Sequence, residues 1–244
     1  MQTMERRKIT YRLYPSKTQG VSLKAQLRSH QQLYNAALEQ RIDAWKRRRV
    51  SVGYADQCKE LTDLRRECPE FADVNCSSQQ RTLRRLDLAF QAFFRRVKAR
   101  ADSAGFPRFK SLDAFPGFGF KSHGDGWRFT PGADWRHGKL RIQGLDKPLK
   151  ARGQARTGGE VKAAELLHRD GVWHLSLTIE CAPVRECGAA ACGMDWGLEH
   201  FASLAFQDGG SEHIANPRRV RKAARALRVA QRSLARKKRG GKNR

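Results

Sequence analysis

The stretch KITYRLYPSKTQ, residues 8–19, indicates how the first half of the chain folds. Residues 7–13 alternate between apolar and polar side chains, which is the period-two pattern of a strand with one buried face. Pro15 ends this pattern, and Ser16 with Gln19 three residues later has the spacing of a helix capping box. The sequence therefore predicts a strand that leads directly into a helix.

Helical periodicity continues through the first hundred residues. The first helix is expected to run from residue 16 to the basic residues 46–49, a shorter helix covers 54–67, and a longer one covers 77–102. In the last of these, apolar residues step by three and four, as in a helix that packs on another helix: Leu83, Leu86, Phe90, Phe93 and Val97. Arginine and lysine occupy the other faces, so we expect a helical unit with a cationic surface.

The composition changes at Gly105. Residues 105–183 are rich in glycine, proline and short alternating runs, which favours an antiparallel β domain. Asp170-Gly171 predicts a hairpin turn, Trp173 lies in the strand that follows it, and residues 139–142 predict another strand. The phenylalanines of the region fit core packing better than stacking on unpaired bases, although both readings stay open: Phe106, Phe109, Phe115, Phe118 and Phe120.

A third region begins near Ala189. A short apolar run there predicts a strand that ends at Asp195, and residues 201–206 predict the next strand. Asn216-Pro217 is typical of a helix start, with asparagine as the N-cap. The helix after it is expected to bury a stripe made of Val220, Ala223, Leu227, Ala230 and Leu234.

The charge of the chain points to a polyanionic partner. Lysine and arginine number 49 against 24 acidic residues, a formal net charge of +25. No run approaches the length of a membrane span and no signal peptide is evident, so we expect a cytoplasmic protein that binds nucleic acid and no membrane. Six cysteines include no C-x-x-C pair, which argues against a zinc site.

Several motifs, taken in order, resemble the transposon-encoded TnpB family, also known as OrfB-type transposases. They are Tyr11-Arg12-Leu13-Tyr14-Pro15, Leu83-Arg84-Arg85-Leu86-Asp87, Phe106-Pro107-Arg108-Phe109-Lys110, Gly193-Met194-Asp195-Trp196-Gly197, Asn216-Pro217-Arg218 and the basic end of the chain. Members of that family are RNA-guided DNA endonucleases related to type V CRISPR effectors.

The resemblance implies an α+β multidomain fold. Residues 1–15 would supply the first strand of a wedge domain, and 16–103 a helical recognition lobe with a helix-turn-helix-like N-terminus. Residues 104–188 would form the β-barrel-like wedge domain itself. Residues 189–244 would begin a RuvC nuclease domain of RNase H-like fold and stop before it is complete.

The resemblance also implies that Asp195 is the first catalytic carboxylate and a metal ligand. Such nucleases hold Mg²⁺ between several acids, which activate water and stabilise the leaving oxygen. Only Glu199, Asp208 and Glu212 follow Asp195, all close to it in sequence. We therefore expect Mg²⁺ not to bind productively and this chain not to cut DNA. The alternative for Asp195 is a strand-end residue that caps a turn.

Two groups of binding residues follow from the same resemblance. Gln79, Gln80, Arg81 and Arg84 would face the DNA next to the target, because glutamine can pair with an adenine edge; helix N-cap surroundings are the alternative. Contacts to RNA phosphates would come from Arg108, Lys110, Arg218, Arg219, Arg221, Lys222, Arg225, Arg236, Lys237, Lys238, Arg239 and Lys242. The alternative for the basic tail is a solvated face.

Three functions are consistent with these sequence features. The first is guide-RNA-directed binding of double-stranded DNA without cleavage, in which base pairing with the guide supplies specificity. The second is a fragment of an active RNA-guided endonuclease from a mobile element. The third is a DNA-binding protein that needs no guide RNA.

Overall fold

The computed structural model describes residues 4–101, 103–155, 157–183, 188 and 190–237. The chain divides into two compact units, Met1–Val184 and Arg185–Arg244. The predicted helices and the predicted β domain belong to the first unit together, so the finer division at residue 103 stays a prediction. Among the described residues, no helix combines the length and apolar character needed to cross a membrane.

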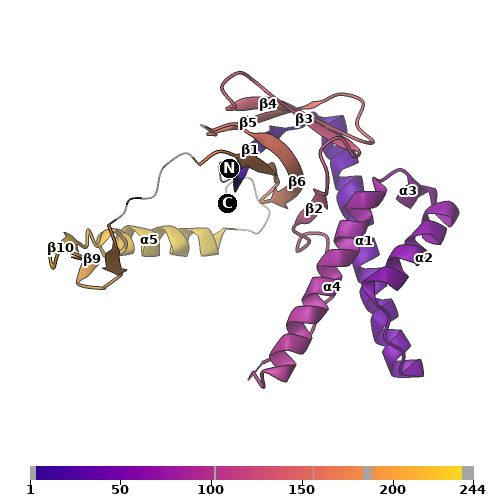
Figure 1. Ribbon diagram of the computed structural model, residues 1–244, viewed down its shortest axis with the longest axis horizontal. Coiled ribbons are helices and arrows are strands. Elements are labelled where there is room, and N and C mark those ends of the chain that lie inside the picture. Colours follow the sequence, from indigo (N-terminus) through magenta and orange to yellow (C-terminus); the bar gives the residue numbers. More distant parts are fainter. Residues whose placement is uncertain (1–3, 102, 156, 184–187, 189, 238–244) are drawn as a thin grey trace. The chain divides into compact units, whose positions relative to one another are not determined.

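A curled, seven-stranded antiparallel sheet forms one half of the first unit (Figure 1). The strands lie in the order β2-β6-β7-β1-β5-β4-β3. Their bounds are β1 Glu5–Tyr14, β2 Gly117–Phe120, β3 Trp127–Pro131, β4 His137–Ile142, β5 Leu149–Gly153, β6 Glu160–Arg169 and β7 Val172–Cys181. The first strand of the chain therefore lies in the middle of the sheet, paired with β5 on one side and β7 on the other.

Local sequence patterns place the strands as expected. In β1, Tyr11 and Leu13 are buried while their neighbours are exposed, which confirms the predicted alternation. The β6–β7 hairpin turns at Asp170 and Gly171, whose φ angles of 50° and 76° are those of a two-residue hairpin turn. Gly117 in β2 has a φ of 141°, and a Cβ there would lie 1.9 Å from the Leu166 carbonyl oxygen of β6, so this close approach requires glycine.

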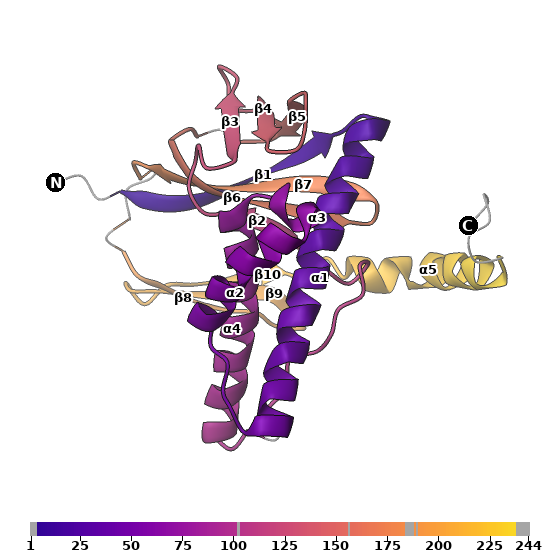
Figure 2. The same ribbon diagram turned by 90° about the vertical axis from the view of Figure 1, so that its right-hand side faces the viewer.

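Four helices form the other half of the first unit: α1 Lys17–Arg48, α2 Tyr54–Glu67, α3 Pro69–Ala72 and α4 Cys76–Lys98. The capping box at the start of α1 is present, since Ser16 Oγ accepts from Gln19 N and Gln19 Oε1 accepts from Ser16 N at 2.9 Å. The short α3 was not predicted. Figure 2 shows α1 and α4 running beside each other below the sheet, and these two helices pack together.

The helices and the inner face of the sheet share one hydrophobic core. From the helices it takes Leu23, Leu27, Leu38, Leu83 and Leu86, and from the sheet mainly aromatic and branched residues. Phe115, Phe118 and Phe120 are buried in it, which supports core packing for these three, whereas Phe106 and Phe109 are exposed. His30 is also fully buried between α1 and α4, where its ring stacks on Phe118 with centroids 4.6 Å apart.

The second unit holds a three-stranded sheet in the order β10-β9-β8 and a helix. Their bounds are β8 Cys192–Asp195, β9 His200–Phe206, β10 Ser211–Ala215 and α5 Arg219–Arg236. The N-cap prediction was wrong: Arg218 is the N-cap, because the Asn216 side chain instead bonds the Leu198 carbonyl and the Arg218 amide. The predicted buried stripe of α5 was also wrong, since no described residue of this helix is buried.

Candidate nucleic-acid interface

The α4 helix carries the predicted DNA-binding residues at its N-terminal half. Asn75 starts the helix, because its Oδ1 accepts from the Ser78 amide at 2.9 Å. Leu83 and Leu86 fix the rotation of the helix by burying one face in the core. The residues that lie between these two buried leucines face β2, β6 or solvent.

A cavity of about 510 Å³ lies where α4 meets β2 and β6. Gln80, Arg81 and Arg84 line it, so the structure brings together three of the four predicted DNA-binding residues. Arg85, Lys121 and Glu165 also line it, as does Tyr54 from α2. Four cationic groups and one carboxylate therefore share this hollow, which gives it an excess of positive charge.

Glu165 orients two of the guanidinium groups. Its Oε1 lies 3.6 Å from Arg81 Nη2 and 4.0 Å from Arg85 Nη2. Arg85 also donates to the Gly117 carbonyl, and burial lowers the pKa of its guanidinium while the nearby Glu165 raises it. Arg85 is thus held by the sheet, whereas the side chains of Arg81 and Arg84 remain 36% and 48% exposed and can reach a ligand.

Arg84 is fixed from the other side. Its Nη1 donates to Asp87 Oδ2 at 2.8 Å, and its guanidinium carbon lies 5.4 Å from the centroid of the Tyr54 ring. Asp87 is shared with Arg41 of α1, at 3.3 Å. Because a guanidinium offers five donors, Arg84 keeps N–H groups for a phosphate or a base edge after these contacts.

Backbone packing leaves room for the arginines. Gly119 of β2 lies in the wall of the cavity, and a Cβ there would come within 2.9 Å of Arg81 Nε and 3.2 Å of the Ala164 carbonyl oxygen. A larger residue would push the Arg81 side chain out of its present position. The glycine therefore sets the place of this guanidinium beside Glu165.

Gln79 does not belong to this surface, so its predicted role in reading DNA is corrected. Its side chain is fully buried, where Oε1 accepts from Arg65 and Nε2 donates to the Phe71 carbonyl at 2.9 Å. Arg65 also donates to the Val74 carbonyl, at 2.6 Å. Gln79 thus links the segments that connect α2, α3 and α4. This is a structural role near the start of a helix, which was the alternative to DNA reading given for this residue.

The prediction missed the other residues of the cavity, among them Tyr54, Arg85 and Lys121. Arg85 lies one helical turn after Arg81, and that i,i+4 spacing could have found it. Lys121 follows β2 and Tyr54 begins α2, so only the packing of distant segments brings them to α4. No local sequence signal predicts that these segments pack against α4.

Arg108 and Lys110 lie elsewhere. Their segment is tied to α1, because the Lys110 carbonyl accepts from Gln31 Nε2 at 2.7 Å and from Asn35 Nδ2 at 2.9 Å. Lys110 Nζ lies 5.9 Å from the centroid of the Tyr34 ring, and Arg108 is exposed. The structure does not bring either residue into the α4 cavity.

Asp195 is the last residue of β8 and is exposed, opposite Ser203 of β9. Within the described part of the chain, no group of three or more histidine, cysteine, aspartate or glutamate side chains could hold a metal ion. A two-metal nuclease site needs several carboxylates to hold its ions, and the exposed Asp195 alone does not form such a set. The described residues around Asp195 therefore do not fit the metal that the family resemblance implies.

The predicted phosphate contacts of the second unit gather on α5. Arg219, Arg221, Lys222, Arg225 and Arg236 lie in the helix, all exposed; Arg218 precedes it and Lys237 follows it. Arg218 has a φ of 46°, and its amide donates to Asn216 Oδ1 at 2.9 Å. Lys238, Arg239 and Lys242 lie outside the described residues.

Comparison with known proteins gives a family match. Residues 4–49 match the OrfB/IS605 family model described as a helix-turn-helix domain. In the structure this segment holds β1 and the single long helix α1. A curated protein of Streptomyces pristinaespiralis named RNA-guided DNA endonuclease is 30% identical over 253 aligned positions, which cover all of this chain and 58% of that protein. The chain thus spans less than two thirds of the length of this relative.

Two solved structures are also similar. A Cas12f1 complex with sgRNA and target DNA aligns over 96% of this chain and 62% of that chain, at 14% identity and a TM-score of 0.41. A CRISPR-Cas12f ternary complex aligns over 93% and 54%, at 15% identity and a TM-score of 0.39. The family model and the curated relative confirm the resemblance to the TnpB/OrfB-type family that was found in the sequence.

Proposed function

We propose that the chain binds double-stranded DNA under the direction of a guide RNA. The observation that carries this proposal is the α4 cavity, where Gln80, Arg81 and Arg84 converge with a net positive charge. In RNA-guided recognition, base pairing reads the target while the protein reads a short flanking motif. A partly enclosed hollow with one amide and several guanidinium groups suits that limited task.

The two exposed arginines and the glutamine have different proposed contacts with DNA. Arg81 and Arg84 provide forked donors for phosphates or guanine edges, and the Gln80 amide matches an adenine edge. Glu165 and Asp87 hold the guanidinium groups in place before DNA arrives. This preorganisation lowers the entropy cost of binding.

The second unit is proposed to begin a RuvC domain whose α5 helix contacts phosphates of the guide or the heteroduplex. An exposed helix that carries seven arginine and lysine residues favours such contacts. Arg108 and Lys110 are proposed as further phosphate contacts of the first unit. Cleavage by this 244-residue chain alone is not expected, because Asp195 has no carboxylate cluster among the described residues.

The first experiment asks whether the protein carries RNA and reads a flanking motif. Co-purified RNA is sequenced, and the complex then selects DNA duplexes that contain the guide-matched target beside randomised flanks. We expect Gln80→Ala to relax one flanking position, with a loss of about 1–3 kcal/mol in discrimination. Arg84→Ala should weaken binding, and melting curves check that the variant folds.

Arg66→Ala provides the matched control, because Arg66 is an exposed arginine of α2 that pairs only with Asp63 among the described residues. It should leave motif selection unchanged. Purified protein without a discrete RNA, combined with sequence-specific binding to bare duplex, would replace the proposal with the guide-independent function.

The second experiment asks whether the chain cuts. The RNA complex is incubated with target DNA and Mg²⁺, for wild type and for Asp195→Ala. We expect no cleavage by either protein and equal DNA affinity. Cleavage by wild type that disappears in Asp195→Ala would show an active nuclease instead.

A further inference from the structure

The outer face of the curled sheet carries a second concentration of positive charge, away from α4. Six exposed cations lie opposite one another in like-charge pairs across neighbouring strands. The pairs are Arg128 and Arg141 across β3 and β4, Lys139 and Lys150 across β4 and β5, and Arg152 and Arg12 across β5 and β1. These six residues are called the cationic strand face.

Such pairing carries a cost in free energy. Like charges directly opposite each other on a sheet repel and destabilise it. Within the described residues, none of the six has an ion pair with an acid. The alternate residues of the same strands are apolar and buried, so the fold itself requires only that this face be polar. The choice of cations at all six positions points to a polyanion.

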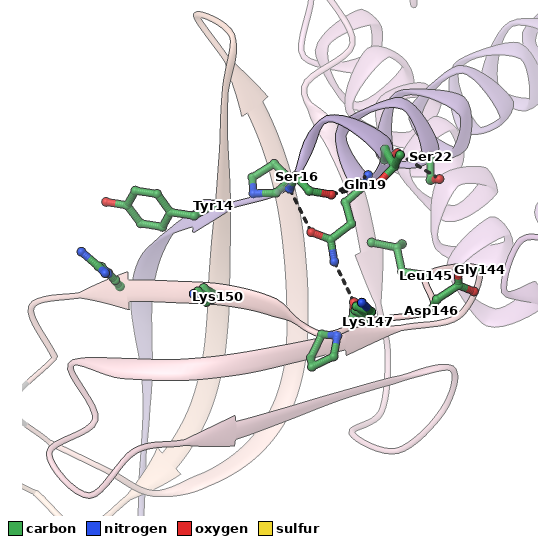
Figure 3. Close-up of a pocket in the computed structure, with 13 residues that line it drawn as sticks. Tyr14, Ser16, Gln19, Ser22, Gly144, Leu145, Asp146, Lys147 and Lys150 are labelled. Carbon is green, nitrogen blue, oxygen red and sulfur yellow. Dashed lines mark hydrogen bonds between the residues drawn. The ribbon is translucent and has the colours of Figure 1, made fainter.

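Two cavities along this face share lining residues. One, of about 820 Å³, lies between the end of β1, the start of α1 and the β4–β5 connection, and it is drawn in Figure 3. The other, of about 530 Å³, lies over β3, β4 and β5. Both are lined by Lys150 and Arg152, and Lys139 lines the second. The two linings together, called the path, cross the strands and include Lys139, Lys150 and Arg152.

An aromatic ring lies at the α1 end of this path. Tyr14 faces Lys150 across the strands, is 43% exposed, and lines the larger cavity (Figure 3). The guanidinium carbons of Arg12 and Arg152 lie 5.4 Å and 5.2 Å from the centroid of its ring. An exposed ring between cations is the arrangement with which proteins stack a nucleobase and hold its phosphates.

The far wall of the larger cavity is hydrogen-bonded to the start of α1. Gln19, held by the capping box of α1, donates from Nε2 to the Lys147 carbonyl at 2.9 Å, which fastens the β4–β5 connection to the helix (Figure 3). The Lys147 and Lys150 side chains then line the same hollow, with Asp146 as its acid.

We propose that the cationic strand face and Tyr14 bind an unpaired stretch of nucleic acid, with one base stacked on the Tyr14 ring and the phosphates over the paired cations. The geometry favours a single strand over a duplex, because stacking on Tyr14 needs a base with a free face. The partner is distinct from the duplex assigned to the α4 cavity. The inference rests on the chain being a nucleic-acid-binding protein.

The test measures binding of labelled single strands of about 12 uridines or thymidines, and of a duplex of equal length, by fluorescence anisotropy over a range of salt concentrations. Tyr14→Leu should weaken single-strand binding about 5- to 150-fold, and Tyr14→Phe should keep most of it because the ring remains. The double variant K150Q/R152Q should lower the salt slope by about 1.4, as two phosphate contacts are lost. The RNA and DNA strands show which sugar the face accepts.

Thermal unfolding separates binding from folding. K150Q/R152Q relieves like-charge repulsion, so its melting temperature should equal or exceed that of wild type while its affinity falls. R47Q/R66Q makes the same change in net charge on exposed helix positions and should leave the salt slope unchanged. Equal losses on duplex and single strands, or no loss in Tyr14→Leu, would overturn the inference. Motif selection through Gln80 would survive that result, so the two proposals fail separately.

Discussion

The buried His30 should make the stability of the first unit depend on pH. The imidazole is enclosed between α1 and α4: Nδ1 lies 2.9 Å from Thr82 Oγ1 and Nε2 lies 3.3 Å from Ser78 Oγ. Thr82 Oγ1 donates to the Ser78 carbonyl, so it accepts from Nδ1–H, and Nε2 accepts from the Ser78 hydroxyl. A second proton on Nε2 would place a positive charge in this buried site and force the Ser78 hydroxyl to turn and accept instead of donating.

The size of the effect follows from the shift. Burial, with a further contribution from the positive Arg85, lowers the pKa of His30 from 6.5 to about 3. Between these values the unfolded chain binds a proton that the folded protein does not, so stability falls as the pH falls through this window. From about pH 7 to about pH 5 the loss attributable to His30 is about 2 kcal/mol, at about 1.4 kcal/mol per unit.

Urea unfolding at several pH values, followed by tryptophan fluorescence, measures this loss for wild type and His30→Gln. The variant will be less stable at neutral pH because packing is lost, but its stability should fall by about 2 kcal/mol less on acidification. His168→Gln is the control, because that ring is only partly buried and a smaller change is expected. Parallel pH profiles for wild type and His30→Gln would refute the reasoning.

Three further predictions concern the frame of the two candidate sites. Leu86→Ala should cost about 2–5 kcal/mol in urea unfolding because the side chain is fully buried, whereas Leu88→Ala, 51% exposed in the same helix, should cost less than about 0.5 kcal/mol. Gly117→Ala should lower the melting temperature far more than Gly124→Ala; both have positive φ, but only at Gly117 would the new Cβ overlap a backbone oxygen, and equal losses would contradict this account. Ser16→Ala should cost about 1 kcal/mol in urea unfolding by removing the α1 cap, and a loss that is absent would show that the capping box contributes nothing.

Elements that depend on local residue patterns could be predicted from the sequence. The alternation in β1, the capping box at Ser16 and the Asp170-Gly171 turn each depend on residues within one element, and the structure confirms them. The start of α5 was misplaced because Asn216 uses its amide on Leu198, a contact that spacing does not reveal. The apolar stripe on α5 shows that the helix is amphipathic. It does not show that another element packs on that stripe.

The candidate site was predictable only along one helix. Gln80, Arg81 and Arg84 lie within two turns of α4, so sequence spacing keeps them together. Gln79 lies one residue from Gln80, and only its rotation toward Arg65 and Phe71 decides that it is buried. The pairing of Arg12 with Arg152, and of Tyr14 with Lys150, joins segments far apart in the chain, so it could not be predicted without the strand register.

The central place of β1 determines when the sheet can form during synthesis. This strand is synthesised well before its partners β5 and β7, which place Gly153 opposite Tyr11 and Leu177 opposite Ile9. The helices α1 to α4 are complete before either partner exists, and pairing over such sequence separations is slow because the intervening loop must close. The nascent chain therefore carries β1 as an unpaired strand until β5 emerges, and the other edge of β1 stays open until β7 follows.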